Sequence, residues 1–347
     1  MGAVSTVKTK PKLPRELYRA STLGSLGFIA VSMAFHYGGG LGIYLALSSG
    51  MAWWLAAPLV VVSTLVAGQG LHLYGWIGHQ AFHGNLFRTK KASILGGVAV
   101  SATIPGVFCV VGYYAGHWNH HLFTNTDRDP DVNLHSYRSI WSKLFVLRFL
   151  QNGVFRSQTV TLARGKELPF ASRLPFKPRD VISLARFNLA LCLAVLAAHV
   201  AFIVVWPLLG VSLFVIPLAG GFLVSGPRPF VEHGGLEAGE GVDARTRASV
   251  WATWFYFWNN YHLEHHLYPS VPCYKLGRVH RLLRESGYFE EHRSPVEPTL
   301  AGGLRHMFAR YPAGEPPEAG AAVTTDEMQH AAADDRLSPA RPSVQRT

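Results

Sequence analysis

Eight histidines fall into three short clusters whose spacing suits metal binding. The first cluster is a pair at i and i+4, and the other two are His-x-x-His-His runs. On a helix, offsets of three and four residues lie on one face, so three imidazoles can converge on one point. Neutral imidazole is a common ligand of transition metals. The pattern predicts a metal site built from His79, His83, His117, His120, His121, His262, His265 and His266.

The number of clustered imidazoles indicates more than one ion. Structural zinc takes four protein ligands and catalytic zinc commonly takes three, so eight histidines exceed what one ion binds. A single zinc and a hydrolytic zinc pair remain alternatives, although the chain has no His-Glu-x-x-His motif. Haem ligation and a proton relay are further alternatives. Iron is favoured, because imidazole ligands suit it.

Long stretches without Asp, Glu, Lys or Arg must position these clusters. They cover residues 20–87, 92–126 and 187–227. A membrane-spanning helix needs about 20 predominantly apolar residues, so the first and third stretches each suit a hairpin of two spans. We expect the spans over Leu23–Leu47, Ala52–Leu73, Leu184–Trp206 and Leu208–Val224.

The clusters must share one side of the membrane if they share one site. The helix of the second span is expected to continue through Trp76 and Ile77 and to carry the first cluster. Residues 92–114 are apolar but rich in Gly, Ser and Thr and contain Pro105. A full crossing there would put the first and second clusters on opposite sides, so we expect a buried or re-entrant segment. Both termini and every cluster are then expected on the cytoplasmic side.

The charge balance fits a membrane surface. The chain has 32 Lys and Arg against 21 Asp and Glu, a formal net charge of +11. These basic residues flank apolar runs, which favours a face against anionic lipid, and no nucleic-acid-binding motif is present. Between Asp127 and Asp180 the apolar residues Ile140, Leu144, Leu147 and Leu150 recur at helical spacing, so either an interfacial helix or a solvated basic loop is expected.

The three cysteines and the N-terminal segment limit the redox chemistry and the targeting signals that can be expected of the chain. Cys109, Cys192 and Cys273 form no Cys-x-x-Cys motif, so neither a disulfide framework nor an iron–sulfur site is predicted. The basic N-terminal lead is followed by an apolar run that is too long for a cleavable signal peptide. A reducing cytosol is therefore compatible with this chain.

The order and spacing of the clusters resemble the membrane fatty-acid desaturase superfamily. The run His120-His121-Leu122-Phe123-Thr124-Asn125, followed by Asp129-Pro130-Asp131, is similar to its acyl desaturase branch. So is the run from Asn260-Tyr261-His262 to Ser270-Val271-Pro272. The resemblance covers about residues 20–283.

The resemblance implies a ligand set and a reaction. It adds a ninth metal ligand, His233, the only histidine between His199 and His262. It implies two iron ions and O₂ as co-substrate for removing hydrogen from an unactivated methylene, which gives a double bond in an acyl chain. A hydroxylase or ketolase of the same superfamily, acting on a carotenoid, sterol or fatty acid, is the alternative. A non-catalytic metal carrier is a third reading.

The resemblance also implies partners. The substrate is expected to be a lipid or an acyl thioester. Electrons are expected from a separate protein of the ferredoxin or cytochrome b5 type and its reductase, because the chain has no His-Pro-Gly-Gly haem motif. Carboxylates commonly orient metal-bound imidazoles, and the candidates are Asp131, Glu232 and Glu264.

Other histidines and aromatic residues are given ordinary roles. His36, His72 and His199 lie in or beside spans, and we expect them to make polar contacts there. His280 and His292 are expected to be ordinary cytoplasmic histidines, like His135, His306 and His330. The aromatic residues between Trp251 and Trp258 are expected at the membrane surface rather than in a substrate channel.

These observations predict an all-α integral membrane protein. Four transmembrane helices form two hairpins, and a cytoplasmic helical cap holds a di-metal site. The expected divisions are a basic cytoplasmic N-terminus (1–22), a membrane desaturase-like domain (23–312) and a disordered C-terminal tail (313–347).

Overall fold

The computed structural model describes residues 10–104, 108–126, 128–129, 134, 137–168 and 176–309. The chain divides into two units, Met1–Ala313 and Gly314–Thr347. The second unit lies outside the described residues, so the disordered tail at 313–347 stays a prediction. The first unit holds every helix and strand described below.

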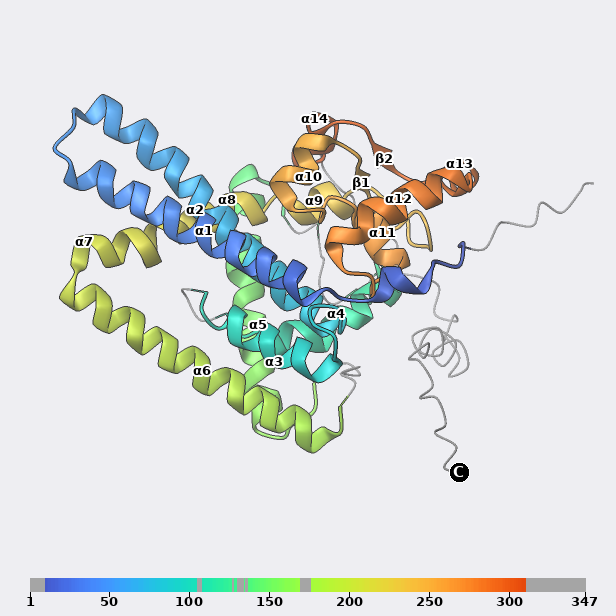
Figure 1. The fold of residues 1–347 in the computed structure, drawn as a ribbon, viewed down its shortest axis with the longest axis horizontal. Coiled ribbons are helices and arrows are strands. Elements are labelled where there is room, and N and C mark those ends of the chain that lie inside the picture. Colours follow the sequence, from blue (N-terminus) through green and yellow to red (C-terminus); the bar gives the residue numbers. More distant parts are fainter. Residues whose placement is uncertain are drawn as a thin grey trace, which may run out of the picture. The chain divides into compact units, whose positions relative to one another are not determined.

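Four helical stretches are long and apolar enough to cross a membrane, as predicted. Three are the single helices α1 (Thr22–Ser48), α2 (Trp53–Phe82) and α6 (Pro178–Val205). The fourth covers Pro207–His233 and runs through α7 (Pro207–Gly210), the π-helix η4 (Val211–Val215), α8 (Ile216–Ser225) and α9 (Arg228–His233). Figure 1 shows them as two hairpins, α1 with α2 and α6 with α7.

Small residues let the spans approach closely. A Cβ atom added at Gly68 of α2 would lie 2.0 Å from the carbonyl carbon of Gly220 in α8. One added at Gly39 of α1 would lie 2.5 Å from the backbone nitrogen of Ala67. Helices in a membrane associate through such close backbone contacts. The predicted polar contact of His36 is also present, because its Nε2 lies 2.9 Å from the carbonyl oxygen of Leu213.

Helix α2 continues beyond the apolar part of its span. Its first half is largely exposed, whereas nearly every residue from Ala67 to Phe82 is buried. The helix ends at Phe82 with His83 as its C-cap, so the predicted continuation carries the first histidine cluster. One rigid helix therefore links the membrane to the metal-binding residues.

The segment after the first cluster forms two shorter helices. These are α3 (Lys90–Ser101) and α4 (Val110–Phe123), and neither is among the candidate spans. At Gly97 of α3 an added Cβ would lie 2.1 Å from the Cβ of Ala81, so α3 packs tightly on the end of α2. The expectation of a buried segment agrees with this arrangement.

An amphipathic helix follows. The π-helix η3 (Ser142–Val146) leads into α5 (Leu147–Ala163). Trp141 and Phe149 are 68% and 67% exposed, which suits insertion into a membrane interface. The predicted apolar stripe is wrong in one respect: Leu147 is only 1% exposed and faces the protein, whereas Leu150 is 50% exposed and faces outward.

The remaining helices form a cap. It contains β1 (Thr246–Arg247), which pairs in parallel with β2 (Val296–Glu297). Its helices are α10 (Val250–Tyr256), α11 (His262–Leu267), η5 (Cys273–Lys275), α12 (Leu276–Glu285), α13 (Tyr288–His292), α14 (Leu300–Leu304) and η6 (Arg305–Met307). The N-terminal turn η1 (Arg15–Tyr18) docks on this cap, where Glu16 accepts a 2.6 Å hydrogen bond from Lys275 through its backbone oxygen.

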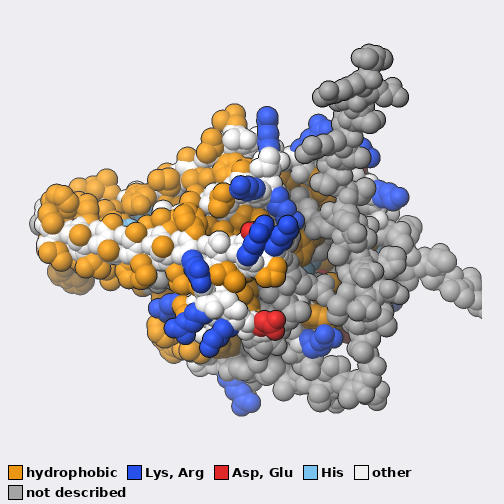
Figure 2. Space-filling view, turned by 90° about the horizontal axis from the view of Figure 1, so that it is seen from below, with side chains coloured by type: hydrophobic (Ala, Val, Ile, Leu, Met, Phe, Trp, Pro, Cys, Tyr) orange, Lys and Arg blue, Asp and Glu red, His pale blue; other side chains and the backbone are white. Residues whose placement is uncertain are grey.

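Apolar and basic side chains lie on different parts of the surface. Figure 2 shows apolar side chains over the protruding spans, and Lys and Arg side chains gathered beyond one end of that apolar region. Trp53 and Val204, near the far ends of α2 and α6, are 79% and 74% exposed. Such large exposed apolar surfaces fit contact with lipid, so the structure is that of a multi-pass membrane protein.

Candidate metal centre

The structure brings all nine predicted histidines together in two groups. The ligand atoms within each group all lie within 4.8 Å of one another. The five-histidine group contains His79, His83, His117, His121 and His265, and the four-histidine group contains His120, His233, His262 and His266. Two such groups side by side are suited to a pair of metal ions.

The three imidazoles of each His-x-x-His-His run do not converge on one point, although their spacing was expected to bring them together. In α4, His117 and His121 join the five-histidine group and His120 joins the other. In α11 the middle residue, His265, is again the one that crosses over. A helix turns about 100° per residue, so positions i+3 and i+4 point about 100° apart. The expectation is wrong because that angle is wide enough to serve two ions.

Hydrogen bonds hold the first cluster against the third. The side-chain amide of Asn85, just after α2, donates to the backbone oxygens of Pro269 and Val271 at 2.9 and 3.2 Å. Within α2, Oε1 of Gln80 accepts from the backbone nitrogen of Cys273 at 3.0 Å. These bonds fix the end of α2 to the loop that follows α11.

The turn into α11 is strained and is held by asparagine side chains. Phe257 and Trp258 have φ angles of 48° and 63°, in the left-handed region. That region costs a residue other than glycine about 1–2 kcal/mol. Asn259 donates to the backbone oxygen of Tyr256 at 2.9 Å, and Asn260 donates to that of Arg247 at 2.7 Å. Such strain is typical of functional sites, and here it sets the direction in which α11 begins.

Among the described residues, several of these imidazoles are buried without the hydrogen bonds that buried polar groups usually make. Burial, reinforced by the neighbouring imidazoles, lowers the pKa of His83, His121 and His265 well below the ordinary value. Within the described residues, neither ring nitrogen of His79, His83 or His265 has a hydrogen-bond partner. Buried polar groups are normally hydrogen-bonded, so these nitrogens require an explanation. Neutral imidazole is the metal-binding form, and the donor set fits transition-metal ions.

Two aspartates that the sequence analysis missed orient the four-histidine group. Nδ1 of His120 lies 2.9 Å from the Asp129 carboxylate. Nδ1 of His266 lies 3.4 Å from Oδ2 of Asp243, and Nδ1 of His233 lies 3.0 Å from the backbone oxygen of the same aspartate. Burial raises the pKa of Asp243 to about 6, and the nearby His233 and His120 partly oppose that rise.

The predicted orienting carboxylates are placed differently. Asp131 lies outside the described residues. Glu264 accepts from Thr246 and lies 2.6 Å from Nδ1 of His280, which is buried rather than an ordinary cytoplasmic histidine. Glu232 has one oxygen 3.8 Å from Nε2 of His262. Of the two candidates that the structure describes, Glu232 is the one whose carboxylate lies beside a predicted metal ligand.

A buried arginine network adjoins Glu232. Arg228 forms an ion pair with Glu232, and its guanidinium lies 4.6 and 4.7 Å from the ring centres of Trp76 and Tyr256. Arg228 also approaches Nε2 of His72 at 3.2 Å, where Trp76 donates at 3.1 Å. His72 is therefore engaged outside both groups. The signal available in the sequence was the spacing of Arg228 and Glu232 at i and i+4.

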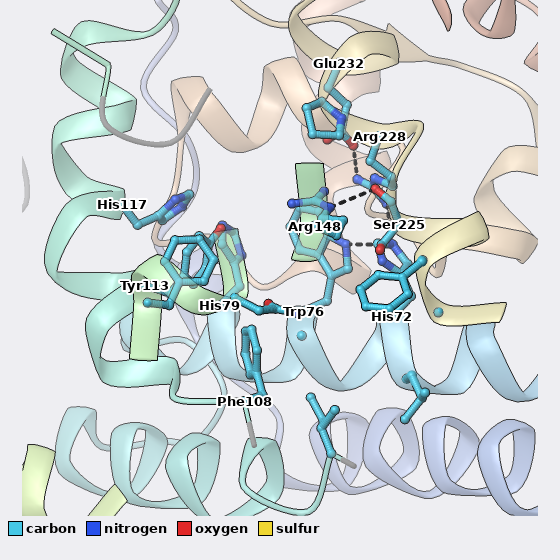
Figure 3. A pocket seen from close by; sticks show the side chains of 18 of the residues that line it. His72, Trp76, His79, Phe108, Tyr113, His117, Arg148, Ser225, Arg228 and Glu232 are labelled. Atoms are coloured by element: carbon cyan, nitrogen blue, oxygen red, sulfur yellow. Dashed lines mark hydrogen bonds and ion pairs between the residues drawn. The ribbon is translucent and has the colours of Figure 1, made fainter. Parts of the chain in front are cut away.

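A cavity of about 200 Å³ reaches this centre. Its polar wall includes His79, His117, His120, His233 and His262, and its apolar wall includes Leu71, Ile104, Phe108, Tyr113, Phe155, Leu218 and Phe222. Figure 3 shows His79 and His117 on one side, Arg228 and Glu232 on the other, and Arg148 between them. The predicted metal ligands thus face a largely apolar space.

Comparison with known proteins agrees with this geometry. The family model described as fatty acid desaturase matches residues 51–299, a range that contains all nine histidines. A Delta(5) fatty acid desaturase of Caenorhabditis elegans is 25% identical over 259 residues, which cover 64% of this chain and 57% of the relative. The chain therefore spans little more than half the length of that relative. The family match covers most of the chain, and the resemblance drawn from the histidine motifs is confirmed: the chain belongs to the fatty acid desaturase family.

Proposed function

We propose that this protein is an O₂-dependent diiron desaturase that introduces a double bond into the acyl chain of a lipid. The observation that carries the proposal is the pair of buried imidazole groups opening onto an apolar cavity. Neutral nitrogen ligands suit iron, and an apolar cavity suits a hydrocarbon chain. The family match and the named relative support the same reaction.

The residues of the chain have distinct tasks in this reaction. All nine histidines of the two groups would hold the irons, which when bound supply O₂ activation and the oxidising power to remove hydrogen from a methylene. Asp129 and Asp243 hold the rings of the four-histidine group in place. Tyr113, Phe108 and Phe155 line the space in which a methylene would lie, and their apolar surfaces exclude water from it.

The electron donor and the orientation are part of the proposal. Exposed basic residues include Lys90, Lys91, Arg164, Lys166 and Arg179. An acidic ferredoxin or cytochrome b5 type donor would be drawn to such a face, which the charge rule assigns to the cytoplasm. Cysteine reporters at the exposed positions Lys91, Arg128 and Glu285 should label from the cytoplasmic side. Labelling of Arg128 and Glu285 from opposite sides would contradict the orientation.

Metal content and lipid products test the proposal directly. Protein purified in detergent with iron supplied should bind about two irons per chain, as nine imidazole ligands imply. Expression in a host should add acyl chains with one new double bond to its lipid profile. Expression of an inactive variant should not. One metal per chain, or activity with zinc retained in place of iron, would overturn the diiron assignment. A hydroxylated product would replace the desaturase with the hydroxylase alternative.

A further inference from the structure

Helix α9 meets the metal centre on one side and an apolar cluster on another. Glu232 and His233 line the cavity, whereas Phe230 and Val231 pack in a buried cluster with Met307. The helix has only six residues. A helix of that length has little stability of its own, so its neighbours must fix its position. The position of His233 therefore depends on the contacts that hold α9.

A buried arginine holds the end of α9 at which His233 stands. Arg245 is 3% exposed, and its Nη1 donates to the backbone oxygen of Val231 at 2.7 Å. Its Nη2 donates to the backbone oxygen of Gly234 at 3.1 Å, and its backbone nitrogen donates to that of Glu232 at 2.8 Å. The last carbonyl groups of a helix have no partner within the helix, and basic side chains commonly bind them. Arg245 therefore fixes the backbone on both sides of His233.

Glu297 joins Arg245 to residues 300–309, which we call the C-terminal segment. Oε1 of Glu297, in β2, lies 3.9 Å from Nε of Arg245 and 2.8 Å from Nη2 of Arg305, which belongs to this segment. A buried guanidinium requires hydrogen bonds and a counter-charge, and Arg245 has both. Strand β1 begins one residue after Arg245 and pairs with β2, so the two strands keep Arg245 and Glu297 adjacent.

The C-terminal segment packs directly against α9. Met307 is 4% exposed and belongs to the same apolar cluster as Phe230 and Val231. Lys143 of η3 is also buried, and its Nζ donates to the backbone oxygens of Met307 and Ala309, both at 2.7 Å. The same ammonium group lies 5.0 Å from the centre of the Phe230 ring. Lys143 therefore ties the segment to the helix on which it packs.

We propose that Arg245, Met307 and Lys143 form a support that positions His233 in the four-histidine group. This inference rests on the proposed function, because it takes that group to be an iron site. The three are positioning residues, since they act through the backbone and the buried face of α9. The C-terminal segment lies beyond residues 51–299, which the family model matches, so membership of the family does not by itself predict this support.

Release of iron tests the support without requiring turnover. The full chain, loaded with iron in detergent, is titrated with a chelator, and the iron that remains bound is measured. Arg245→Met keeps an unbranched side chain but removes its N–H donors to α9. We expect one of the two ions to be bound roughly 10-fold more weakly, as for other residues that orient metal ligands. The other ion should leave as in the wild type, whereas a general loss of stability would loosen both.

Matched variants separate positioning from folding. Arg245→Lys keeps a cation at the end of α9 and should recover part of the binding. Lys143→Met removes both bonds to the C-terminal segment and should loosen the same ion, and it decides the matter if Arg245→Met does not fold. Arg278→Met is the control, because that arginine is 55% exposed and pairs with Glu16 on another part of the cap, where an ion pair contributes little. Unchanged iron binding in the folded variants, or equal loss of both ions, overturns the proposal.

Hydrogen exchange separates failure of this inference from failure of the proposed function. With and without iron, the backbone amides of residues 228–234 should exchange faster in Arg245→Met and Lys143→Met than in the wild type or in Arg278→Met, because loss of these contacts favours local opening. If the wild type binds no iron, the proposed function fails, while the exchange rates still decide whether the support holds α9. Exchange at the wild-type rate in both variants would mean that other contacts position His233, and it would overturn the inference.

Discussion

The two histidine groups are made from the same helices but are held in different ways. In the five-histidine group, His79, His83 and His265 have no hydrogen-bond partner on either ring nitrogen among the described residues. In the four-histidine group, His120 and His266 each have an aspartate beside Nδ1. Three rings of the first group are oriented by packing, whereas His120, His233 and His266 of the second group have an oxygen beside Nδ1.

The contacts around the rings show this difference. The ring of His79 lies 4.5 Å from that of Trp76, and the ring of His83 lies 4.8 Å from that of Trp118. Aromatic packing fixes where an imidazole lies, but it does not select which nitrogen carries the proton. A carboxylate or a carbonyl oxygen at Nδ1 does select it and leaves Nε2 for a metal. Polar partners therefore orient His120, His233 and His266 of the four-histidine group, and packing orients His79, His83 and His265 of the five-histidine group.

Loss of one ligand from either group should have the largest effect. His265→Ala and His233→Ala each remove one nitrogen from one group, and we expect each to lower turnover by about 10²-fold or more, because outer-sphere changes alone cost 10–100-fold. Activity and bound iron at matched expression measure the effect. His292→Ala is the control, because the contacts of this ring among the described residues are with Tyr288 in the cap: its Nδ1 lies 3.0 Å from the backbone oxygen and the two rings stack.

Tolerance of one of these two substitutions would contradict the assignment of that histidine as a metal ligand. Full activity and full iron in His233→Ala would mean that His233 is not a metal ligand. The ninth ligand would then have to be found elsewhere. His72 is a poor substitute, because Trp76 and Arg228 already occupy its Nε2.

The sequence was sufficient to predict the spans and the identity of the clustered residues. Charge-free stretches such as residues 187–227 mark the membrane helices without any knowledge of packing. The spacing of His117, His120 and His121 marks a metal site in the same direct way. Both signals are local, because each depends only on which residues follow one another along the chain.

The division of the histidines and their partners could not be predicted in this way. Which ion His120 faces depends on the rotation of α4 relative to α11, and no spacing rule contains that angle. Asp243 comes from a loop far along the chain, which Asn125 holds by donating to its backbone oxygen at 2.8 Å. Asn125 has a φ angle of 63°, so a left-handed residue just after α4 helps to build the site.

Removing a carboxylate should have the second largest effect and should be confined to one group. Asp129→Asn and Asp243→Asn keep the shape but replace an acceptor at Nδ1 with an amide, so we expect 10–100-fold weaker binding of one of the two ions. A chelator titration followed by iron analysis should then show one ion leaving early and the other leaving as in the wild type. Glu240→Gln is the matched control, because that carboxylate is exposed. Equal weakening of both ions would mean that the two groups are not held independently.

The smallest effect should come from the two asparagines that fix the loops. Asn85→Ala removes the donors to Pro269 and Val271, which join the end of α2 to the loop after α11. Asn125→Gly removes the donor to Asp243 while keeping a residue that accepts the left-handed backbone. Each loss of buried hydrogen bonds should cost about 1–3 kcal/mol of stability and weaken metal binding only several-fold.

These two variants should act on different groups. The bonds of Asn85 set the separation of His79 and His83 from His265, so Asn85→Ala should loosen the ion of the five-histidine group. Asn125 places the loop that carries Asp243, so Asn125→Gly should loosen the ion of the four-histidine group. Thermal unfolding in detergent and chelator titration of both variants measure the two effects. If both variants loosen the same ion, the separation of the groups into a packed one and a hydrogen-bonded one is wrong, because the two loops would then support a single shared unit.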